Sequence, residues 1–305
     1  MKVKRKKINY TLLCMALSGL IFLILFNYLP MFGIVIGFKD MDYVLNIKKA
    51  LKTSEFVGLQ NFVAFLKDKE FMNIMINTLG LNLLQLLITF PVPVLFAILL
   101  NELKLPRFKK TVQTVTYFPY FISWVVFGGI ILGMISPEGG VVNQLLVSLH
   151  IIDNPIAFNS NPAYFWGIVI ISSLIKGLGW GAIIYIAAIA GIDQSLFDAA
   201  RVDGANRWHK NMYITIPCIA GTIVVMLLLS ISGLLSSNFD QIYILQNPLN
   251  LTRSEVLDTY IYKIGISQRR YSFTTAIGLF KSFISMVLLS SGHLLSKKLF
   301  GRGLF

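Results

Sequence analysis

Four polar side chains interrupt one long apolar stretch at helical spacing. They are Thr78, Asn82, Gln85 and Thr89, spaced so that all four share one face of an α-helix. Hydrocarbon offers no hydrogen-bond partners, so such a face turns towards a neighbouring helix or a wet cavity. The chemistry available there is hydrogen bonding through amides and hydroxyls. Two interpretations follow: the face lines a pathway for a polar solute, or it makes hydrogen bonds between helices.

A second chemical group, the ammonium of Lys176, lies well inside a later apolar stretch. A charged side chain at the centre of a bilayer costs at least about 2.5 kcal/mol, so it faces protein or water rather than lipid. It either lines a cavity and attracts an anionic solute, or it binds backbone carbonyls or a carboxylate of a second subunit. Lys281 lies nearer the end of its stretch, and we expect it to extend to the membrane surface.

The polar segment 193–217 lies between two apolar stretches of the second half of the chain. Ser195 and Asp198 fit a capping box, which predicts a helix that begins just after this serine. Gly204 suits the left-handed end of that helix, and a second helix is expected from about Asn206. A short helix, a turn and a second helix at a membrane face either connect two spans or dock a partner protein.

Membrane spans must position all of these groups. The chain has 305 residues, of which 55% are hydrophobic and 13% charged, and its mean hydropathy is +0.70. A spanning helix needs about 20 mostly apolar residues. Six stretches satisfy this requirement: 10–38, 72–100, 112–135, 164–192, 218–237 and 273–295. The first is too long for a signal-peptide core, so we expect it to remain as an anchor.

The net charge of +13 follows the expected topology. Six spans place both termini on one side, together with the segments 101–111 and 193–217. Lys and Arg prevail on that side and Asp and Glu on the other, although the first outer loop is also rich in lysine. The positive-inside rule therefore places both termini in the cytoplasm. The charge is a matter of topology, and we expect no nucleic-acid partner.

Gly129 and Gly133 in the third stretch, and Gly177 and Gly181 in the fourth, have the spacing that permits close approach of helices. The three histidines and two cysteines are scattered and show no metal-ligand spacing, so no metal site is expected. No nucleophile lies with a base, which argues against an enzyme. The six stretches hold no Asp or Glu, whereas an ion-coupled secondary transporter is expected to carry intramembrane carboxylates.

The segment 193–217 also resembles a known signature. Asp198-Ala199-Ala200, then Gly204, and Ile214-x-Ile216-Pro217 after nine further residues, are similar to the Glu-Ala-Ala loop of permease subunits in ATP-driven, binding-protein-dependent importers. Asp198 replaces the usual glutamate and Ile216 the usual leucine. The segments 27–40, 57–62, 100–102, 113–119 and 179–188 resemble the polysaccharide and oligosaccharide branch of the maltose-type carbohydrate uptake group, which is typical of Gram-positive bacteria.

The resemblance implies an all-α membrane protein with the six transmembrane helices of a type I ABC importer permease core and a cytoplasmic coupling helix. We expect a basic cytoplasmic N-terminus at 1–9, a permease domain at 10–295 with its coupling loop at about 193–217, and a cytoplasmic tail at 296–305. The residues expected to contact the ATPase are Asp198, Ala199, Ala200, Asp203, Gly204, Ile214 and Pro217.

The same resemblance implies the partners. They are a second homologous permease, a cytoplasmic ATPase dimer, an extracellular substrate-binding lipoprotein, an oligosaccharide and the lipid of a bacterial plasma membrane. This chain has no Gly-x-x-x-x-Gly-Lys-Ser/Thr loop, so ATP and Mg²⁺ belong to the partner ATPase and no cofactor is expected here. Candidate pathway residues for a sugar are Asn82, Gln85, Lys176, Trp180 and Tyr185. The alternative is an importer of the same type for an amino acid or phosphate.

Overall fold

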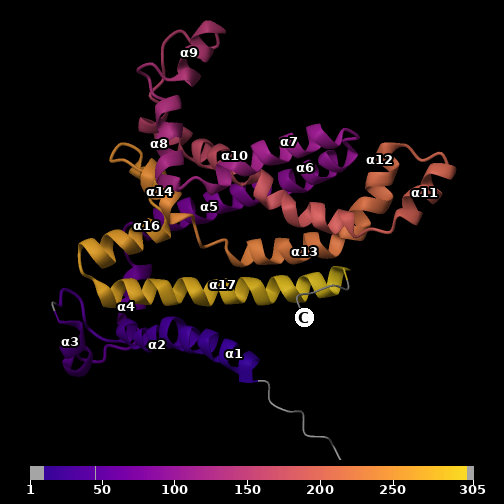
Figure 1. Cartoon of the computed structure of the whole chain (residues 1–305). Coiled ribbons are helices and arrows are strands. Elements are labelled where there is room, and N and C mark those ends of the chain that lie inside the picture. Colours follow the sequence, from indigo (N-terminus) through magenta and orange to yellow (C-terminus); the bar gives the residue numbers. More distant parts are fainter. Residues whose placement is uncertain (1–9, 45, 301–305) are drawn as a thin grey trace, which may run out of the picture. The chain divides into compact units, whose positions relative to one another are not determined.

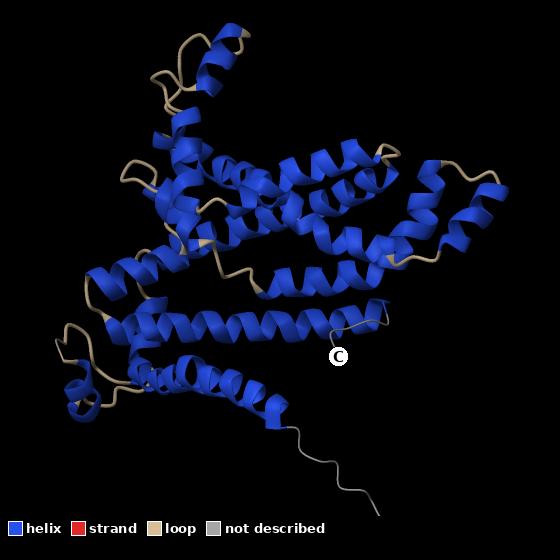
Figure 2. Cartoon of the chain, in the orientation of Figure 1, coloured by secondary structure: helices blue, strands red, loops and turns tan. Residues whose placement is uncertain are grey.

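The structure, a computed structural model, describes residues 10–44 and 46–300. Within these residues the regular elements are helical (Figure 2), and two isolated antiparallel bridges join Lys39 to Phe56 and Asp42 to Arg270. Backbone contacts divide the chain into two compact units, Met1–Asp68 with Ile261–Phe280, and Lys69–Tyr260 with Lys281–Phe305. The predicted permease domain 10–295 spans both units. The predicted segment 1–9 and the last five residues of the predicted tail 296–305 lie outside the described residues.

Five helical segments of the described chain are long and apolar enough to cross a membrane, or six if one bent pair counts as a span. The five are Tyr10–Phe38, Phe71–Glu102, Pro162–Ala190, Arg207–Ser232 and Tyr271–Lys298. The bent pair is Pro106–Phe121 with Trp124–Met134. Because these segments correspond to the six predicted stretches, the all-α membrane fold is confirmed, with one correction in the third span.

The third span is broken, whereas the sequence predicted a continuous helix over 112–135. Helix α7 (Pro106–Tyr117) passes into a 3₁₀ turn, Phe118–Phe121, and α8 (Trp124–Met134) begins after Ser123. The two halves are bent by 104°. Pro119 lacks a backbone N–H, and the Ser123 hydroxyl accepts a hydrogen bond from the Val126 amide at 3.3 Å, so one helix ends and another begins here.

The longest helix that lies entirely within the second unit is α10 (Pro162–Ala190). Helices α5 (Phe71–Thr89) and α6 (Pro91–Glu102) form the second span, interrupted at Phe90. The fifth span joins α12 (Arg207–Lys210), a π-helical turn (Asn211–Thr215) and α13 (Ile216–Ser232). Shorter helices are α9 (Val141–Ser148), α11 (Gln194–Val202), α14 (Phe239–Leu245) and α15 (Leu251–Ser254). Helix α10 packs against α5, α6, α7, α13, α14 and α15, whereas α9, α11 and α12 project away from it (Figure 1).

Two buried apolar clusters hold this unit together, and α10 contributes to both. The first contains Ala97 of α6, Tyr185 of α10 and Ile219 of α13. The second contains Leu81 of α5 and Phe165 of α10 with residues of α14. Because one helix runs through both clusters, a displacement of α10 is expected to disturb the packing of every span in contact with it.

The first unit contains the N-terminal span and the start of the last one. The N-terminal span consists of α1 (Tyr10–Leu23), a π-helical turn (Ile24–Tyr28), α2 (Leu29–Met31) and a 3₁₀ helix (Phe32–Phe38). Helices α3 (Ile47–Thr53) and α4 (Gln60–Leu66) follow. Helix α16 (Leu257–Tyr262) and a π-helical turn (Lys263–Ser267) precede α17 (Tyr271–Phe300).

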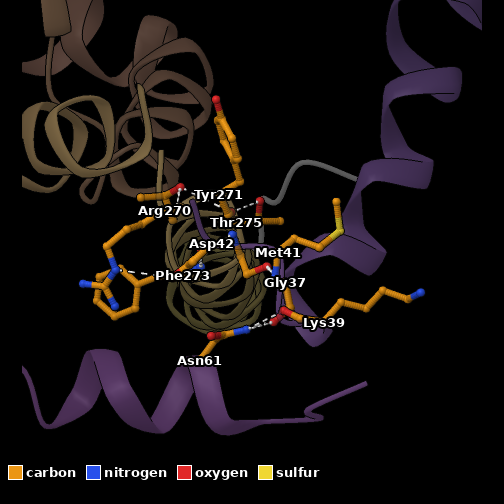
Figure 3. A network of polar contacts seen from close by, with 11 residues as sticks. Gly37, Lys39, Met41, Asp42, Asn61, Arg270, Tyr271, Phe273 and Thr275 are labelled. Atoms are coloured by element: carbon orange, nitrogen blue, oxygen red, sulfur yellow. Dashed lines mark hydrogen bonds and ion pairs between the residues drawn. The ribbon is translucent and has the colours of Figure 1, made fainter. Parts of the chain in front are cut away.

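A polar network in this unit joins the segment after the first span to the N-terminus of α17 (Figure 3). Asp42 Oδ1 accepts hydrogen bonds from the amides of Ser272 at 2.9 Å and Phe273 at 3.3 Å, and Asp42 Oδ2 pairs with Arg270 at 3.3 Å. A carboxylate at this position satisfies free amides and complements the positive end of the helix. Asn61 of α4 donates to two carbonyls of the same segment.

Candidate functional site

The segment 193–217 folds as the predicted helix, turn and helix, but its first cap differs from the prediction. Asp193, not Ser195, caps α11: its Oδ1 accepts a hydrogen bond from the Ser195 amide at 2.9 Å. The backbone N–H of Ser195, together with its hydroxyl, lowers the pKa of the Asp193 carboxyl below the ordinary value of 3.8. The helix therefore begins at Gln194, two residues earlier than the capping box predicted.

The end of α11 confirms the role predicted for Gly204. This residue has φ +75°, a conformation that glycine adopts without steric cost. The Ala205 amide donates to the Ala200 carbonyl at 2.8 Å, and the Gly204 amide donates to the Arg201 carbonyl at 3.2 Å. These two bonds form a Schellman motif. Asn206 then caps α12 by accepting from the His209 amide at 2.9 Å, which confirms the predicted start of the second helix.

The residues predicted to contact the ATPase divide into an exposed group and an anchoring one. Asp198, Ala199, Asp203 and Gly204 are exposed, and Ala200 is half-buried. Asp198 forms an exposed ion pair with Arg201 at 3.2 Å. Ile214 instead packs against the first apolar cluster, and Pro217, although exposed, lies in the first turn of α13 (Ile216–Ser232). The arrangement presents α11 outwards from an anchored base.

Two cavities of about 360 and 300 Å³ lie inside the second unit. They share five lining residues: Gln85, Thr89, Pro93, Gly181 and Asn238. Asn82 and Tyr185 line the first, and Lys176 lines the second. The structure therefore brings four of the five predicted pathway residues to these cavities. Amide and hydroxyl groups contribute much of the lining.

The polar face of α5 both lines a cavity and joins helices. Asn82 Nδ2 donates to the Leu234 carbonyl at 2.9 Å and to the Ser237 hydroxyl at 3.1 Å. Gln85 Nε2 donates to the Ser173 hydroxyl at 2.8 Å. Thr78 is buried away from the cavities, and its hydroxyl accepts from a backbone amide. The hydrogen bonds between helices are thus confirmed, and the same amides border the cavities, so that the lining of a solute pathway stays a prediction.

Lys176 binds backbone carbonyls at the break of the third span. Its Nζ donates to the carbonyls of Pro119 at 3.0 Å, Tyr120 at 2.9 Å and Ile122. The ammonium also lies 5.3 to 5.8 Å from the centres of three aromatic rings, and the residue is only 7% exposed. Of the interpretations open at the sequence level, binding to backbone carbonyls is confirmed.

Trp180, the fifth predicted pathway residue, stacks on Tyr120 beside the same break. The ring centres are 4.4 Å apart and the planes are 5° from parallel. Trp180 is 46% exposed and lines neither cavity, whereas Tyr120 lines the second. Sequence reasoning missed Tyr120, as well as Asn238 and Gln241 of the cavity walls. Tyr120 lies in the 3₁₀ turn of the broken span, and Asn238 and Gln241 lie at the start of the short helix α14 outside the six apolar stretches, so no span pattern includes them.

The prediction that Lys281 extends to the membrane surface is wrong. Its ammonium pairs with Asp258 of α16, and the two side chains are only 19% and 18% exposed. Asp258 also accepts a hydrogen bond from the Ser237 amide at 2.8 Å. The sequence placed Asp258 in an outer loop, but α16 brings this carboxylate to the last span.

The glycine spacing identified few of the actual close contacts. Within the described chain, an added Cβ at Gly129, Gly133 or Gly177 would meet no atom within 4 Å, and one at Gly181 would meet Pro93 at 3.3 Å. Close contact between α10 and α7 occurs instead at Gly179, where a Cβ would collide with backbone and side-chain atoms of α7. The described residues contain no group of three or more His, Cys, Asp or Glu that could hold a metal ion.

Comparison with known proteins gives a consistent result. Residues 71–301 match the family model described as "Binding-protein-dependent transport system inner membrane component". Protein LplB of Bacillus subtilis (strain 168) is 39% identical over 303 residues, which cover 99% of this chain and 92% of LplB. The polygalacturonan/rhamnogalacturonan transport system permease protein YteP of the same organism is 38% identical and covers 100% of this chain and 95% of its own.

A solved structure shows the same fold. A chain of a bacterial alginate ABC transporter, crystallised in complex with an alginate pentasaccharide-bound periplasmic protein, is 34% identical with a TM-score of 0.87. The similarity covers 97% of this chain and 96% of that chain. The type I permease fold expected from the resemblance is thereby confirmed. The family match and the full-length relatives show that this chain belongs to the binding-protein-dependent transport system inner membrane components, and that it is a multi-pass permease subunit of an ABC importer rather than an enzyme.

Proposed function

We propose that this permease subunit imports an oligosaccharide that contains uronic acid residues. The observation that carries the proposal is the lining of the two cavities, where amides and hydroxyls such as Asn82, Gln85 and Asn238 border the space. These groups suit the many hydroxyls of a sugar. Among the described lining residues Lys176 is the one charged side chain, so no carboxylate repels an anionic sugar.

The relatives support an acidic substrate. YteP is named for polygalacturonan and rhamnogalacturonan, and the similar structure belongs to an alginate transporter. Since each relative covers nearly the whole chain, the likeness extends over the cavity walls as well as the coupling segment. The cavities are also large enough for sugar rings, whereas phosphate or a single amino acid would leave much of the space unused.

The coupling role of the segment 193–217 is part of the same proposal. An exposed α11, capped at both ends and anchored through Ile214, is a rigid projection suited to a groove on another protein. In our proposal the segment docks on a cytoplasmic ATPase dimer that binds ATP and Mg²⁺. Both termini, including the predicted segments 1–9 and 296–305, then lie in the cytoplasm. A second permease and an extracellular binding lipoprotein complete the transporter.

Uptake by the reconstituted transporter tests the substrate. The complete complex, with its binding protein, is placed in liposomes and offered oligogalacturonides, neutral oligosaccharides of equal length, glutamate and phosphate. We expect ATP-dependent uptake of the oligogalacturonide in preference to the neutral sugar. Preferential uptake of the neutral sugar would contradict the acidic class, and uptake of glutamate or phosphate alone would contradict a sugar substrate.

Substitution in α11 tests the coupling role. Ala200→Leu places a bulky side chain on the half-buried face of α11, and we expect it to uncouple ATP hydrolysis from uptake without preventing membrane insertion. Ala163→Leu, at the exposed start of α10 and on the opposite side in the predicted topology, is the matched control. Full ATP-driven uptake by Ala200→Leu would contradict docking through α11.

A further inference from the structure

We infer that Lys176 is a positioning residue for transport, which ties the helix leading to the coupling segment to the wall of the cavity. This inference rests on the proposed function of the chain as an importer. It assigns Lys176 to the mechanics of the cavity wall and not to recognition of a substrate charge. The evidence comes from the contacts of the ammonium, the position of the break and the course of α10.

The ammonium has no donor left for a substrate. A lysine side chain offers three N–H groups, and here three carbonyls accept from them: those of Pro119, Tyr120 and Ile122. These carbonyls follow the end of α7, where carbonyl groups lack their usual partners within the helix. The positive charge also complements the negative end of that helix. Lys176, a residue of another span, therefore supplies hydrogen-bond donors to the carbonyls at the break.

The break that Lys176 holds is part of the cavity wall. Tyr120 precedes the break and Trp124 follows it, and both line the second cavity together with Lys176. The ammonium lies 5.8 Å from the centre of the Tyr120 ring and 5.3 Å from that of Trp124. Because the ammonium contacts both rings, we expect a shift of Lys176 to displace these two aromatic wall residues.

Helix α10 connects this wall directly to the coupling segment. Lys176 precedes the end of α10 at Ala190 by about 14 residues, or about 21 Å at 1.5 Å per residue. Asp193 begins the cap of α11 immediately afterwards. Tyr185 and Ile189 of this stretch are buried in the first apolar cluster, against which Phe197 of α11 also packs. An uninterrupted, well-packed helix thus runs from Lys176 at the break to Ala190, three residues before the cap of α11.

A second contact fixes α10 to α7 one turn further on. A Cβ at Gly179 would collide with the Thr116 carbonyl group and the Tyr117 ring, so only glycine permits the observed approach. Gly167, an exposed residue of the same helix that lines neither cavity, leaves room for a Cβ, which would meet no atom within 4 Å. The two glycines provide matched sites: an alanine at one disturbs the junction between α10 and α7, and an alanine at the other leaves it intact.

The test uses the complete transporter with its binding protein in liposomes. We compare Lys176→Met, Lys176→Arg, Gly179→Ala and the control Gly167→Ala, and we measure uptake of an acidic and a neutral oligosaccharide beside ATP hydrolysis. We expect Lys176→Met to lower the maximal uptake rate by about tenfold for both sugars, with KM nearly unchanged and ATP hydrolysis retained. Lys176→Arg should restore most of the rate, because guanidinium keeps the charge and the donors.

Gly179→Ala should lower the ratio of sugar transported to ATP hydrolysed, and Gly167→Ala should not. A selective loss of the acidic sugar in Lys176→Met would overturn the inference, as would a wild-type maximal rate in this variant. If Lys176→Met does not assemble, the glycine pair decides, and equal behaviour of the two alanine variants overturns the inference. Absence of sugar uptake by the wild-type transporter would instead refute the proposed function, so the two failures are distinct.

Thiol labelling gives a readout that a purely structural role would not move. Phe121 is 71% exposed beside the break, and Phe121→Cys is made in a chain whose exposed Cys14 and Cys218 are replaced by serine. We expect labelling of this cysteine to differ between nucleotide-free and vanadate-trapped transporter, and the difference to disappear on adding Lys176→Met. A difference that persists in Lys176→Met would contradict the transmission through Lys176.

Discussion

Two interruptions of helices in the described chain solve the same physical problem differently. In the segment 193–217, residues two to five positions apart satisfy the helix ends: Asp193, Gly204 and Asn206 all act on their near neighbours. At the break of the third span, Lys176 donates to carbonyls 54 to 57 positions away in the sequence. The hydrogen-bond partners at the first interruption are near neighbours in the sequence, whereas those at the second come from another span.

Water explains the difference. At a membrane face, water satisfies the backbone groups that short-range caps leave open, so a local solution suffices. Within the membrane no water replaces a missing partner, and irregular backbone is tolerated only where protein or a cavity supplies one. At the break, the buried Lys176 supplies hydrogen-bond donors to the backbone, and a cavity lies beside it. We therefore expect the break to depend on its distant partner far more than the coupling segment depends on any one cap.

The largest effect on stability is expected for Lys176→Met. The carbonyl of Pro119 also accepts from the Ile122 amide, but the carbonyls of Tyr120 and Ile122 would lose the lysine. A hydrogen bond from a charged donor contributes about 1.5–3 kcal/mol, so we expect the loss of two to cost about 3–6 kcal/mol. Thermal unfolding of the purified complex measures it, with Lys176→Arg as the control. An unchanged unfolding temperature would mean that the break does not need Lys176.

An intermediate effect is expected for Gly204→Val, which places a β-branched residue at φ +75°. The left-handed conformation costs a non-glycine residue about 1–2 kcal/mol, and a β-branched one more. Because this site is exposed and local, we expect reduced coupling of ATP hydrolysis to uptake with little change in the unfolding temperature. Gly204→Asn, which tolerates this conformation better, should retain more coupling. A global loss of stability in Gly204→Val as large as in Lys176→Met would remove the contrast between the regions.

The smallest effect is expected from protonation of Asp193. Its pKa is lowered in the folded state, so its capping contribution is fully present above the ordinary value of 3.8 and is lost as the pH falls through the lower folded value. We expect hydrogen exchange of the α11 amides to be insensitive to this group near neutral pH and to quicken, relative to the intrinsic rate, only in strong acid. Asp193→Asn should abolish the acid-dependent part. An Asp193-dependent transition near neutral pH would contradict this account.

The sequence alone determined the spans, the coupling segment and the family. Apolar runs reveal spans because hydrocarbon excludes polar side chains, and Gly204 and Asn206 reveal helix ends because their partners are close in the chain. That Asn82 and Gln85 share one face, which borders a cavity, is predictable for the same reason: helical spacing is a local property. The match of residues 71–301 to the permease family agrees with these inferences.

Only the tertiary structure decided which groups Lys176 and Lys281 bind and where the third span breaks. The apolar run continues through Pro119 and Ile122, so hydropathy carries no sign of the 104° bend. The partners of Lys176 and Lys281 come from other helices, and so does the α7 backbone that requires a glycine at 179. In a membrane interior, buried polar groups must be satisfied by whichever helices pack beside them, and packing is a property of the whole fold rather than of neighbouring residues.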